Sequence, residues 1–373
     1  MKSTFGQNIQ FSLFGESHGS AIGVHINGLA PGIPLDLDWL RGQLDRRRPQ
    51  GKISTRRREA DEFEIVSGFF NGYTTGTPLC ILIRNQSQHS RDYDAVKYTL
   101  RPSHADFTAF EKYFGFQDYR GGGHFSGRIT APIVVAGAIC LQILRRKGIE
   151  IATHIAHCRG VADEPFAGTE QELQRQAEVL QGRYFPVLCD RAGQDMVREI
   201  EQAQEQGDSV GGVLETVVLG MPAGIGEPFF GSVESVLAQL LFSIPAVKGV
   251  EFGLGFGFAQ LYGSQANDPF VVRENCVRTK TNHNGGINGG ISNGMPIVLR
   301  TVVKPTPSIY QPQQTVDLQK MQEVQLRIHG RHDPAVIHRA AVVTDSMAAI
   351  GLVDLFVERY GYLWTAPSWK GGE

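Results

Sequence analysis

The chain has 373 residues, and its content of 41% hydrophobic and 20% charged residues allows a large core and excludes an intrinsically disordered protein. Its 36 basic side chains nearly balance 38 acidic ones, so net charge alone gives no affinity for nucleic acid or for anionic membranes. The 44 glycines are not periodic, which excludes a collagen-like fibre.

Seven segments carry the apolar spacing or the end signals of helices. Thr169 and Glu172 form a capping box, and Gly182 stands where a helix commonly ends. An apolar face at helical spacing follows Asp36, and Pro49 stops that helix. In chain order, the predicted helices span Asp36 to Arg48, Thr130 to Arg146, Thr169 to Gly182, Asp190 to Gln206, Ser232 to Ser243, Val316 to Ile328 and Asp345 to Tyr360.

Strands are predicted where β-branched residues alternate or run continuously, at Pro78 to Arg84, Val210 to Leu219 and Pro296 to Val303. The segment Thr130 to Arg146 is apolar almost all round, as expected of a helix buried in a core. No repeat, linker or composition break divides the chain. We therefore predict one α+β domain over residues 1–373, with a peripheral helical segment near residues 158–207, which is rich in Gln, Glu and Ala.

The cysteines and the N-terminus indicate a soluble, cytoplasmic protein. The five cysteines are widely spaced and include no C-x-x-C pair of the zinc or thioredoxin type, so we expect reduced thiols and no metal. The first ten residues lack the apolar run of a secretory signal. The longest apolar stretch, Ala131 to Leu144, is shorter than the roughly 20 residues that a membrane span requires.

Two segments near the N-terminus combine residues that core packing does not call for. In Gly15 to Gly19, glycines bracket an acid, a hydroxyl and an imidazole on a short turn, which is also compatible with a solvated histidine. Between Arg46 and Arg58, seven of thirteen residues are cationic and none is acidic. Guanidinium groups match phosphate and carboxylate oxygens, so this run is a candidate anion clamp. There are three alternatives: a solvated basic loop, a nucleic-acid-binding patch, or ion pairs between these cationic residues and the acids at 59, 61 and 62.

Two further regions add glycine-rich loops. Three glycines at 121–123 precede the helix predicted at Thr130, so backbone N–H groups and a helix N-terminus can approach an anion there. A phosphate or flavin cradle and a flexible glycine loop are both compatible with this segment, which is not a P-loop. Asn and Gly pairs at 282–290, and the Lys and Thr groups at 304–308, offer further donors to an anionic or heterocyclic ligand.

Taken together and in order, these segments resemble the chorismate synthase family over nearly the whole chain. The matching motifs are G-E-S-H-G at Gly15 to Gly19, R-R-R-P ending at Pro49, R-P-x-H-A-D at Arg101 to Asp106, the glycine loop at Gly121, A-V-K-G-V-E at Ala246 to Glu251, G-G-I-x-G-G-I-S-x-G at Gly285 to Gly294, K-P-T-P-S at Lys304 to Ser308 and G-R-H-D-P at Gly330 to Pro334.

The resemblance implies a lyase of the shikimate pathway of aromatic amino acid biosynthesis. Such enzymes eliminate phosphate and a ring hydrogen from 5-enolpyruvylshikimate 3-phosphate to give chorismate, and they need reduced flavin mononucleotide (FMN) without net redox change. The family fold is an α+β sandwich of helices and antiparallel sheets, assembled as a homotetramer. Some members reduce their own flavin with NADPH, and the sequence leaves open whether this chain does.

Residue by residue, the resemblance implies roles for matching positions. His18 would protonate the departing phosphate, His104 would stabilise or protonate the reduced flavin, and Asp333 would assist where the ring hydrogen is taken. Arginines would offset the charge of the anionic ligands. The implied flavin contacts are His124, Phe125, Ser126, Pro245, Ala246, Gly289, Lys304, Pro305, Thr306, Pro307, Ser308 and Arg331, and the implied substrate contacts are Ser17, Arg47, Arg101 and Arg128.

This chain departs from several members at two places. It has His124, Phe125 and Ser126 where they have Arg-Ser-Ser, and Pro245 where they have Asn.

Two rival functions use the same residues. A flavin- or nicotinamide-dependent oxidoreductase would consume a reductant at every turnover. A polyanion- or RNA-binding protein would use the arginine run, but no aromatic residues interleave with those arginines.

Overall fold

Two antiparallel five-stranded sheets form the outer layers of the described part of the chain. The protein is described from a computed structural model, which covers residues 3–54, 60–86, 97–166, 168–328 and 333–367. The first sheet has the order β1–β2–β3–β7–β4, formed by Thr4–Phe5, Gln10–Gly15, Ala21–Asn27, Leu79–Arg84 and Phe63–Ser67. The second has the order β11–β16–β10–β8–β9, formed by Val247–Phe252, Ile297–Val303, Gly212–Leu219, Glu150–Cys158 and Val161–Ala162.

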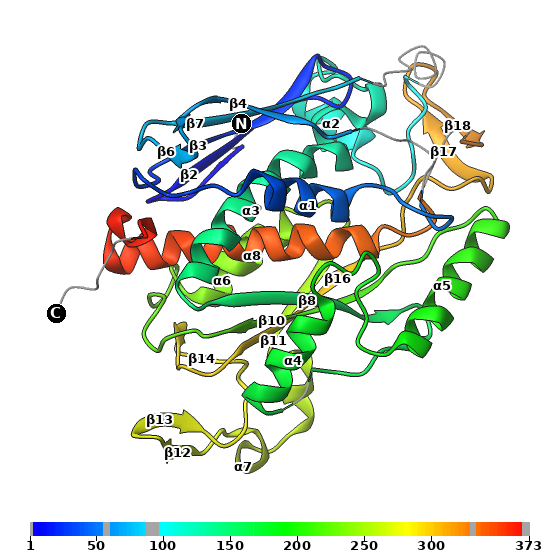
Figure 1. Cartoon of the computed structure of the whole chain (residues 1–373). Coiled ribbons are helices and arrows are strands. Elements are labelled where there is room, and N and C mark those ends of the chain that lie inside the picture. Colours follow the sequence, from blue (N-terminus) through cyan, green and yellow to red (C-terminus); the bar gives the residue numbers. More distant parts are fainter. Residues whose placement is uncertain (1–2, 55–59, 87–96, 167, 329–332, 368–373) are drawn as a thin grey trace.

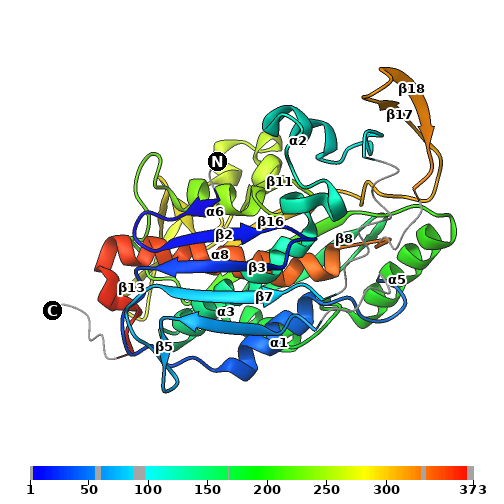
Figure 2. The same ribbon diagram turned by 90° about the horizontal axis from the view of Figure 1, so that it is seen from above.

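Helices fill the space between the two sheets (Figure 1). Helix α3 (Thr130–Arg146) packs under β3 and β7, and α8 (Ile337–Tyr360) packs on β8 and β10. Helix α1 (Leu37–Arg47) packs against both, and α6 (Val233–Phe242) packs on α8 and β11. From above, β2, β3 and β7 lie side by side across the helical layer (Figure 2). The predicted α+β sandwich of helices and antiparallel sheets is confirmed.

The two long central helices approach each other closely at one glycine. A Cβ atom on Gly137 of α3 would lie 2.2 Å from the Cβ of Ser346 in α8, so glycine is required at this contact. By length and composition, Gly127–Arg146 and Ile337–Tyr360 could each cross a bilayer, but 94% and 100% of their 18-residue apolar stretches are buried inside the protein. Their apolar character is therefore that of core helices, as predicted for the first of them.

Smaller elements surround this sandwich. Helix α2 (Asp106–Tyr113) precedes the triple-glycine loop, α4 (Glu170–Leu180) packs on β8 and β10, and α5 (Asp190–Glu205) lies beside β9. The short helical pieces are α7 (Gly263–Ala266) and the 3₁₀ turns Arg120–Phe125, Gly127–Ile129, Gly255–Gln260 and Tyr362–Thr365. Four two-stranded hairpins complete the described elements: β5 (Phe69–Phe70) with β6 (Tyr73–Thr74), β12 (Phe270–Arg273) with β13 (Cys276–Thr279), β14 (Ile287–Asn288) with β15 (Ile291–Ser292), and β17 (Gln313–Asp317) with β18 (Gln322–Leu326).

Most predicted elements are confirmed. The ends of α1, α3, α4, α5 and α6 lie within two residues of the predicted ends, and β7, β10 and β16 fall inside the predicted strands. Helix α8 begins at Ile337 rather than at Asp345. Its start was missed because no side chain caps it and the residue before the helix is Val336, which carries no capping group.

The helix predicted at Val316 to Ile328 is wrong, because this segment forms the β17–β18 hairpin, which projects from the body in Figure 2. Half-buried and exposed residues alternate along Gln313–Asp317, the period of a strand. The Asp317 carboxylate accepts hydrogen bonds from the backbone N–H groups of Gln319 and Lys320, and Met321 has φ +50°, so the chain turns where the helix was expected to continue.

The carboxylate of Asp354 in α8 anchors the loop between β1 and β2. It accepts hydrogen bonds from the backbone N–H groups of Gln7, Asn8 and Ile9 at 3.2, 3.0 and 2.9 Å. We expect Asp354→Ala to lower the free energy of unfolding by about 3 kcal/mol, because the buried N–H group of Ile9 and two part-buried N–H groups lose a charged acceptor. Urea denaturation measures this change. Asp354→Asn keeps one acceptor oxygen and should lose about half as much, and equal stability of Asp354→Ala and the unaltered protein would contradict this role.

Candidate active site

One cavity of about 1150 Å³ gathers segments that are far apart in the sequence. Its walls come from the end of α1, the loop before α2, the glycine loop with the start of α3, the end of α6, the loop after β16 and the start of α8. The residues predicted from the sequence that line it are Arg47, His104, His124, Phe125, Ser126, Arg128, Pro245, Ala246, Lys304, Thr306, Pro307, Ser308 and Asp333.

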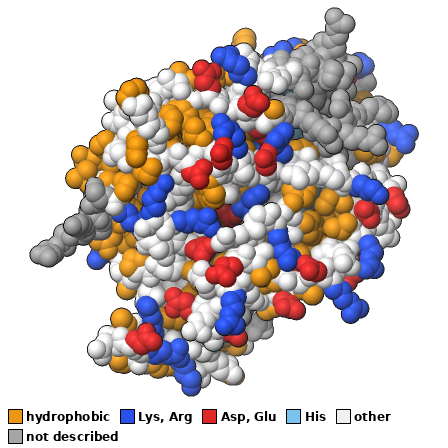
Figure 3. All heavy atoms as spheres, in the orientation of Figure 1, with side chains coloured by type: hydrophobic (Ala, Val, Ile, Leu, Met, Phe, Trp, Pro, Cys, Tyr) orange, Lys and Arg blue, Asp and Glu red, His pale blue; other side chains and the backbone are white. Residues whose placement is uncertain are grey.

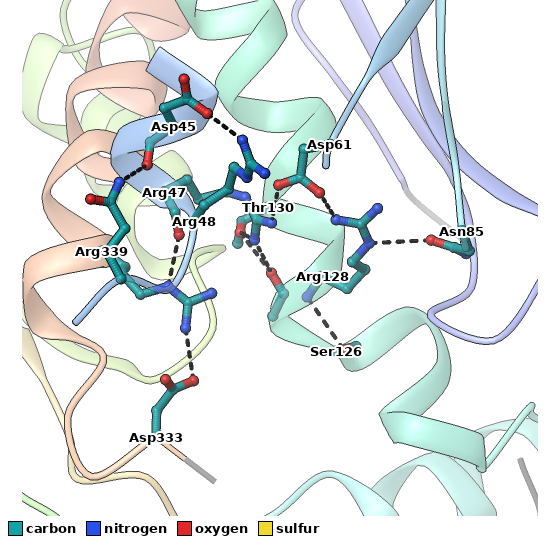
Figure 4. A network of polar contacts seen from close by, with 12 residues as sticks. Asp45, Arg47, Arg48, Asp61, Asn85, Ser126, Arg128, Thr130, Asp333 and Arg339 are labelled. Atoms are coloured by element: carbon teal, nitrogen blue, oxygen red, sulfur yellow. Dashed lines mark hydrogen bonds and ion pairs between the residues drawn. The ribbon is translucent and has the colours of Figure 1, made fainter. Parts of the chain in front are cut away.

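Asp61 lies between two of the predicted substrate arginines, Arg47 and Arg128 (Figure 4). Its carboxylate accepts a hydrogen bond from Arg47 Nη2 at 2.6 Å and another from Arg128 Nη1. Arg47 Nη1 also donates to the Thr130 hydroxyl at 3.3 Å, and Arg128 Nε donates to Asn85 Oδ1 at 3.2 Å. The three charged side chains are at most 5% exposed, so they form a buried ion triad with one net positive charge.

The electrostatics of this triad differ from those of two bare guanidinium groups. Burial alone would raise the pKa of Asp61, but Arg47 and Arg128 lower it, and the pKa lies below its usual value. Burial lowers the pKa of Arg47, while Asp61 opposes that change. Asp61 is therefore ionised and already offsets part of the positive charge. The sequence left open whether the acids after the arginine run pair with it, and Asp61 does.

Asp333 is held at the wall of the cavity by Arg339 of α8 (Figure 4). Arg339 Nη1 donates to Asp333 Oδ2 at 2.7 Å, and Arg339 Nε donates to the backbone oxygen of Arg47, also at 2.7 Å. Both side chains of the ion pair are 16% exposed. One guanidinium group thus joins the predicted catalytic aspartate to the end of α1.

The triple-glycine loop separates the two predicted catalytic histidines. Gly121, Gly122 and Gly123 have φ of +58°, +83° and +54°, a conformation that side chains other than glycine rarely adopt. A Cβ on Gly121 would lie 2.2 Å from Cε1 of His18, and a Cβ on Gly122 would lie 3.5 Å from Cε1 of His104. The loop therefore passes between both imidazoles and packs on each of them.

His104 and Arg101 share one carboxylate, that of Asp106 at the start of α2. His104 Nδ1 lies 2.7 Å from Asp106 Oδ1. Arg101 donates to the same carboxylate through Nη2 at 2.6 Å, Nε at 2.8 Å and its backbone N–H at 2.9 Å. Burial alone would raise the pKa of Asp106, but the hydrogen bonds from Arg101 and His104 bring it far below its usual value.

The segments predicted to hold a flavin contribute apolar walls and a few polar atoms. Phe125 is 40% exposed and its ring centroid lies 6.1 Å from that of Tyr113. Lys304 Nζ donates to the backbone oxygen of Ser103 at 2.7 Å, and burial lowers the pKa of this lysine. The hydroxyl of Thr306 is buried and has no hydrogen-bond partner among the described residues.

His124 has a structural contact at each ring nitrogen. Its Nδ1 lies 2.8 Å from the backbone oxygen of Gly15, and its Nε2 lies 3.3 Å from the hydroxyl of Ser3. At this departure from the pattern of several family members, the imidazole joins the glycine loop to the end of β2.

Several predicted residues do not line the cavity. Ser17 and His18 are buried directly behind Gly121, since a Cβ on that glycine would also lie 3.2 Å from the Ser17 hydroxyl. Gly289 is exposed in the turn between β14 and β15. Pro305 and Arg101 are likewise absent from the lining, although their neighbours Lys304 and His104 belong to it. Arg331 and the arginines at 56–58 lie outside the described residues.

Asp61, Asp106 and Arg339 each pair with a predicted site residue but were not assigned a role from the sequence. Asp106 stood inside the R-P-x-H-A-D motif, so its spacing from His104 was a usable signal. Asp61 pairs with Arg47, 14 positions away, and Arg339 pairs with Asp333, 6 positions away. Neither pair lies within one helix or strand, so the sequence pattern does not predict these pairs.

Comparisons with known proteins identify the family of the chain. The family model described as chorismate synthase matches residues 9–357. The chain is 48% identical over 367 residues to the chorismate synthase of Thermococcus gammatolerans, covering 98% of this chain and 99% of that protein. It is 45% identical over 359 residues to the chorismate synthase of Dehalococcoides mccartyi, covering 95% and 96% of the two chains.

A solved structure extends the likeness to three dimensions. It is described as a crystal structure of chorismate synthase, and it superposes with a TM-score of 0.75 at 29% identity, covering 96% of this chain and 94% of the other. The fold, the motifs and the sequence identity point the same way. With a family model matched over residues 9–357 and relatives near 48% identity along almost the full length, the chain belongs to the chorismate synthase family.

Proposed function

We propose that this chain is a lyase that converts 5-enolpyruvylshikimate 3-phosphate to chorismate and phosphate, using reduced FMN without net redox change. One observation carries the proposal: a single cavity is lined by the acid–base candidates His104 and Asp333, by the anion-binding arginines Arg47 and Arg128, and by the segment 304–308. A substrate with two carboxylates and a phosphate needs this combination of cationic and proton-transferring groups.

The residues present fit reduced FMN. The volume of the cavity suits a flavin together with a substrate, and Pro245, Ala246 and Phe125 supply apolar wall. The buried Thr306 hydroxyl, near Ser308 in the lining, has no partner in the described part of the chain and offers a hydrogen bond to a polar group of the cofactor. When bound, the reduced flavin supplies the transient electron density that helps to expel phosphate.

The chain's own residues bind the substrate and handle protons. Arg47 and Arg128 bind anionic groups, with Ser17 as a further donor, since its buried hydroxyl has no partner among the described residues. His104 holds a proton beside the cofactor, and Asp333 assists removal of the ring hydrogen. His18 lies behind Gly121 rather than on the cavity lining, and we propose that it donates its proton to the departing phosphate past this glycine, which has no side chain to block the path. Because the Arg47 and Arg128 side chains are each only 5% exposed, their charge interactions are stronger than in solution.

An anaerobic assay tests the reaction. Purified protein, substrate and a catalytic amount of dithionite-reduced FMN are mixed, and chorismate and phosphate are followed together. Equal amounts of both products over many turnovers per flavin support the lyase. Consumption of one reductant per turnover would instead identify the rival oxidoreductase. Replacing dithionite with NADPH then tells whether the chain reduces its own flavin.

Removing either histidine is expected to slow the reaction without unfolding the protein. His18→Ala and His104→Ala should each lower turnover by about 10- to 10³-fold, because each removes a positioned proton donor. Steady-state kinetics measure the loss, and circular dichroism checks the fold. His157→Ala, a histidine of β8 outside the cavity lining, is the control. Near-normal rates in both variants would refute these roles.

We also propose a cytoplasmic homotetramer. Phe229, Phe230, Phe256 and Tyr262 are each more than four-fifths exposed, which supports burial against further copies of the chain. Light scattering after gel filtration should give four times the 41.0 kDa mass of one chain, and a monomer would refute the assembly.

On the face drawn in Figure 3, Lys and Arg side chains are interspersed with Asp and Glu, which argues against polyanion binding there.

A further inference from the structure

Asp106 receives more hydrogen bonds than an ordinary ion pair would supply. Its Oδ1 faces His104 Nδ1 at 2.7 Å and Arg101 Nη2 at 2.6 Å. Its Oδ2 accepts from Arg101 Nε at 2.8 Å and from the Arg101 backbone N–H at 2.9 Å. Each oxygen therefore has two partners, and the carboxylate cannot rotate without losing several of them.

This arrangement decides which nitrogen of His104 faces the cavity. An ionised carboxylate only accepts hydrogen bonds, so Nδ1 must carry a hydrogen in both charge states of the imidazole. The proton that is gained or lost is then the one on Nε2. That nitrogen would lie 3.7 Å from a Cβ on Gly122, at the wall formed by the glycine loop.

A second contact holds the same loop from the other side. Lys304 Nζ donates to the backbone oxygen of Ser103, and Ser103 has φ +58°. The loop carrying His104 is thus fixed by Asp106 on the α2 side and by Lys304 on the side of the loop after β16. Side chains fixed at two points need little reorganisation when a ligand binds.

We propose that Asp106 is a positioning residue, which fixes the Nδ1–H tautomer of His104 and at the same time aims the guanidinium group of Arg101. The inference rests on the proposed function for its kinetic consequence, because it makes one carboxylate serve both a proton-transferring and a substrate-binding side chain. Its structural consequence, the tautomer of His104, exists in the ligand-free protein.

Solid-state NMR of sedimented, ¹⁵N-histidine-labelled protein reads the tautomer directly. The resonances of His104 are identified by their loss in His104→Gln. At a pH where the imidazole is neutral, we expect Nδ1–H in the unaltered protein and Nε2–H in Asp106→Ala, which leaves no side-chain acceptor for Nδ1–H. Asp106→Glu, which keeps the carboxylate, should retain Nδ1–H. The same tautomer in the unaltered protein and in Asp106→Ala, or Nε2–H in the unaltered protein, would overturn the proposal.

Kinetics supply the second measurement. Asp106→Asn should lower turnover by about 10²-fold and raise the apparent substrate constant, and Asp106→Glu should recover part of the turnover. In the double variant with His104→Ala, Asp106→Asn should cost no further turnover, because it acts through the histidine. Multiplicative losses would indicate a merely structural role and overturn the proposal.

Asp190→Asn is the matched control. Asp190 is the first residue of α5, as Asp106 is of α2, and it pairs with Arg183 at 2.7 Å. This pair does not line the cavity, so tautomer and turnover should stay unchanged. Absence of chorismate formation by the unaltered protein would refute the proposed function, whereas the NMR result would still decide the role of Asp106.

Discussion

Gly121→Ala is expected to reduce turnover by at least 10²-fold, because the new methyl group would occupy the position of the His18 imidazole. A Cβ at this site would lie 2.2 Å from His18 Cε1 and 2.3 Å from its Nδ1, so the histidine or the loop must move. To relieve these contacts, the His18 ring or the loop must shift by about 1 Å, which is enough to misplace a proton donor. Steady-state kinetics with saturating substrate measure the loss.

Gly148→Ala separates this clash from backbone strain. Gly148 has φ +76°, so alanine there carries a similar conformational cost of about 1 kcal/mol, but no atom lies within 4 Å of the new Cβ. This variant should lose some stability and keep its turnover. If Gly121→Ala were as active as Gly148→Ala, the packing of the glycine loop on His18 would have no part in the reaction.

Asp61→Ala is expected to lower the free energy of unfolding by about 3–5 kcal/mol, because it leaves two buried guanidinium groups without their counter-charge. Arg47 and Arg128 side chains are each 5% exposed, so water cannot replace the lost carboxylate. Urea denaturation measures the change. Millimolar inorganic phosphate should stabilise the variant more than the unaltered protein, since an anion can then take the vacated position.

The matched control for this prediction is an exposed pair of the same chemistry. Asp38 and Arg41 lie 2.5 Å apart on α1 with side chains 92% and 60% exposed. Asp38→Ala should leave stability almost unchanged, because solvent screens such pairs. Equal stability of the Asp38 and Asp61 variants would contradict the buried triad as an element of the folded protein.

Local sequence signals account for most of the helices, but not for α2, for the start of α8 or for every strand. The capping box at Thr169 and the continuous apolar run from Thr130 are read within a few residues, and both helices are present. The hairpin at Gln313–Asp317 and Gln322–Leu326 was mistaken for a helix. Its polar, Gln-rich strands carry few apolar side chains to show a period of two.

The site was predictable where a motif keeps its residues close in sequence and unpredictable where the fold brings them together. His104 and Asp333 stood in recognisable motifs, and both line the cavity. The contact of His18 with Gly121 joins residues over a hundred positions apart, and the pairing of Asp61 depends on where α1 and α3 meet. Such contacts follow from tertiary packing, which no local pattern encodes.

The close contact between Gly137 and Ser346 bears on the width of the cavity. Helices α3 and α8 both begin at the cavity, which Thr130 and Arg339 line, and Gly137 lies about 10 Å along α3 from Thr130 by the rise per residue. A bulkier residue at position 137 would push α3 and α8 apart and would increase the distance between their N-termini. The width of the cavity therefore depends on a helix contact in the core, away from the residues that line the cavity.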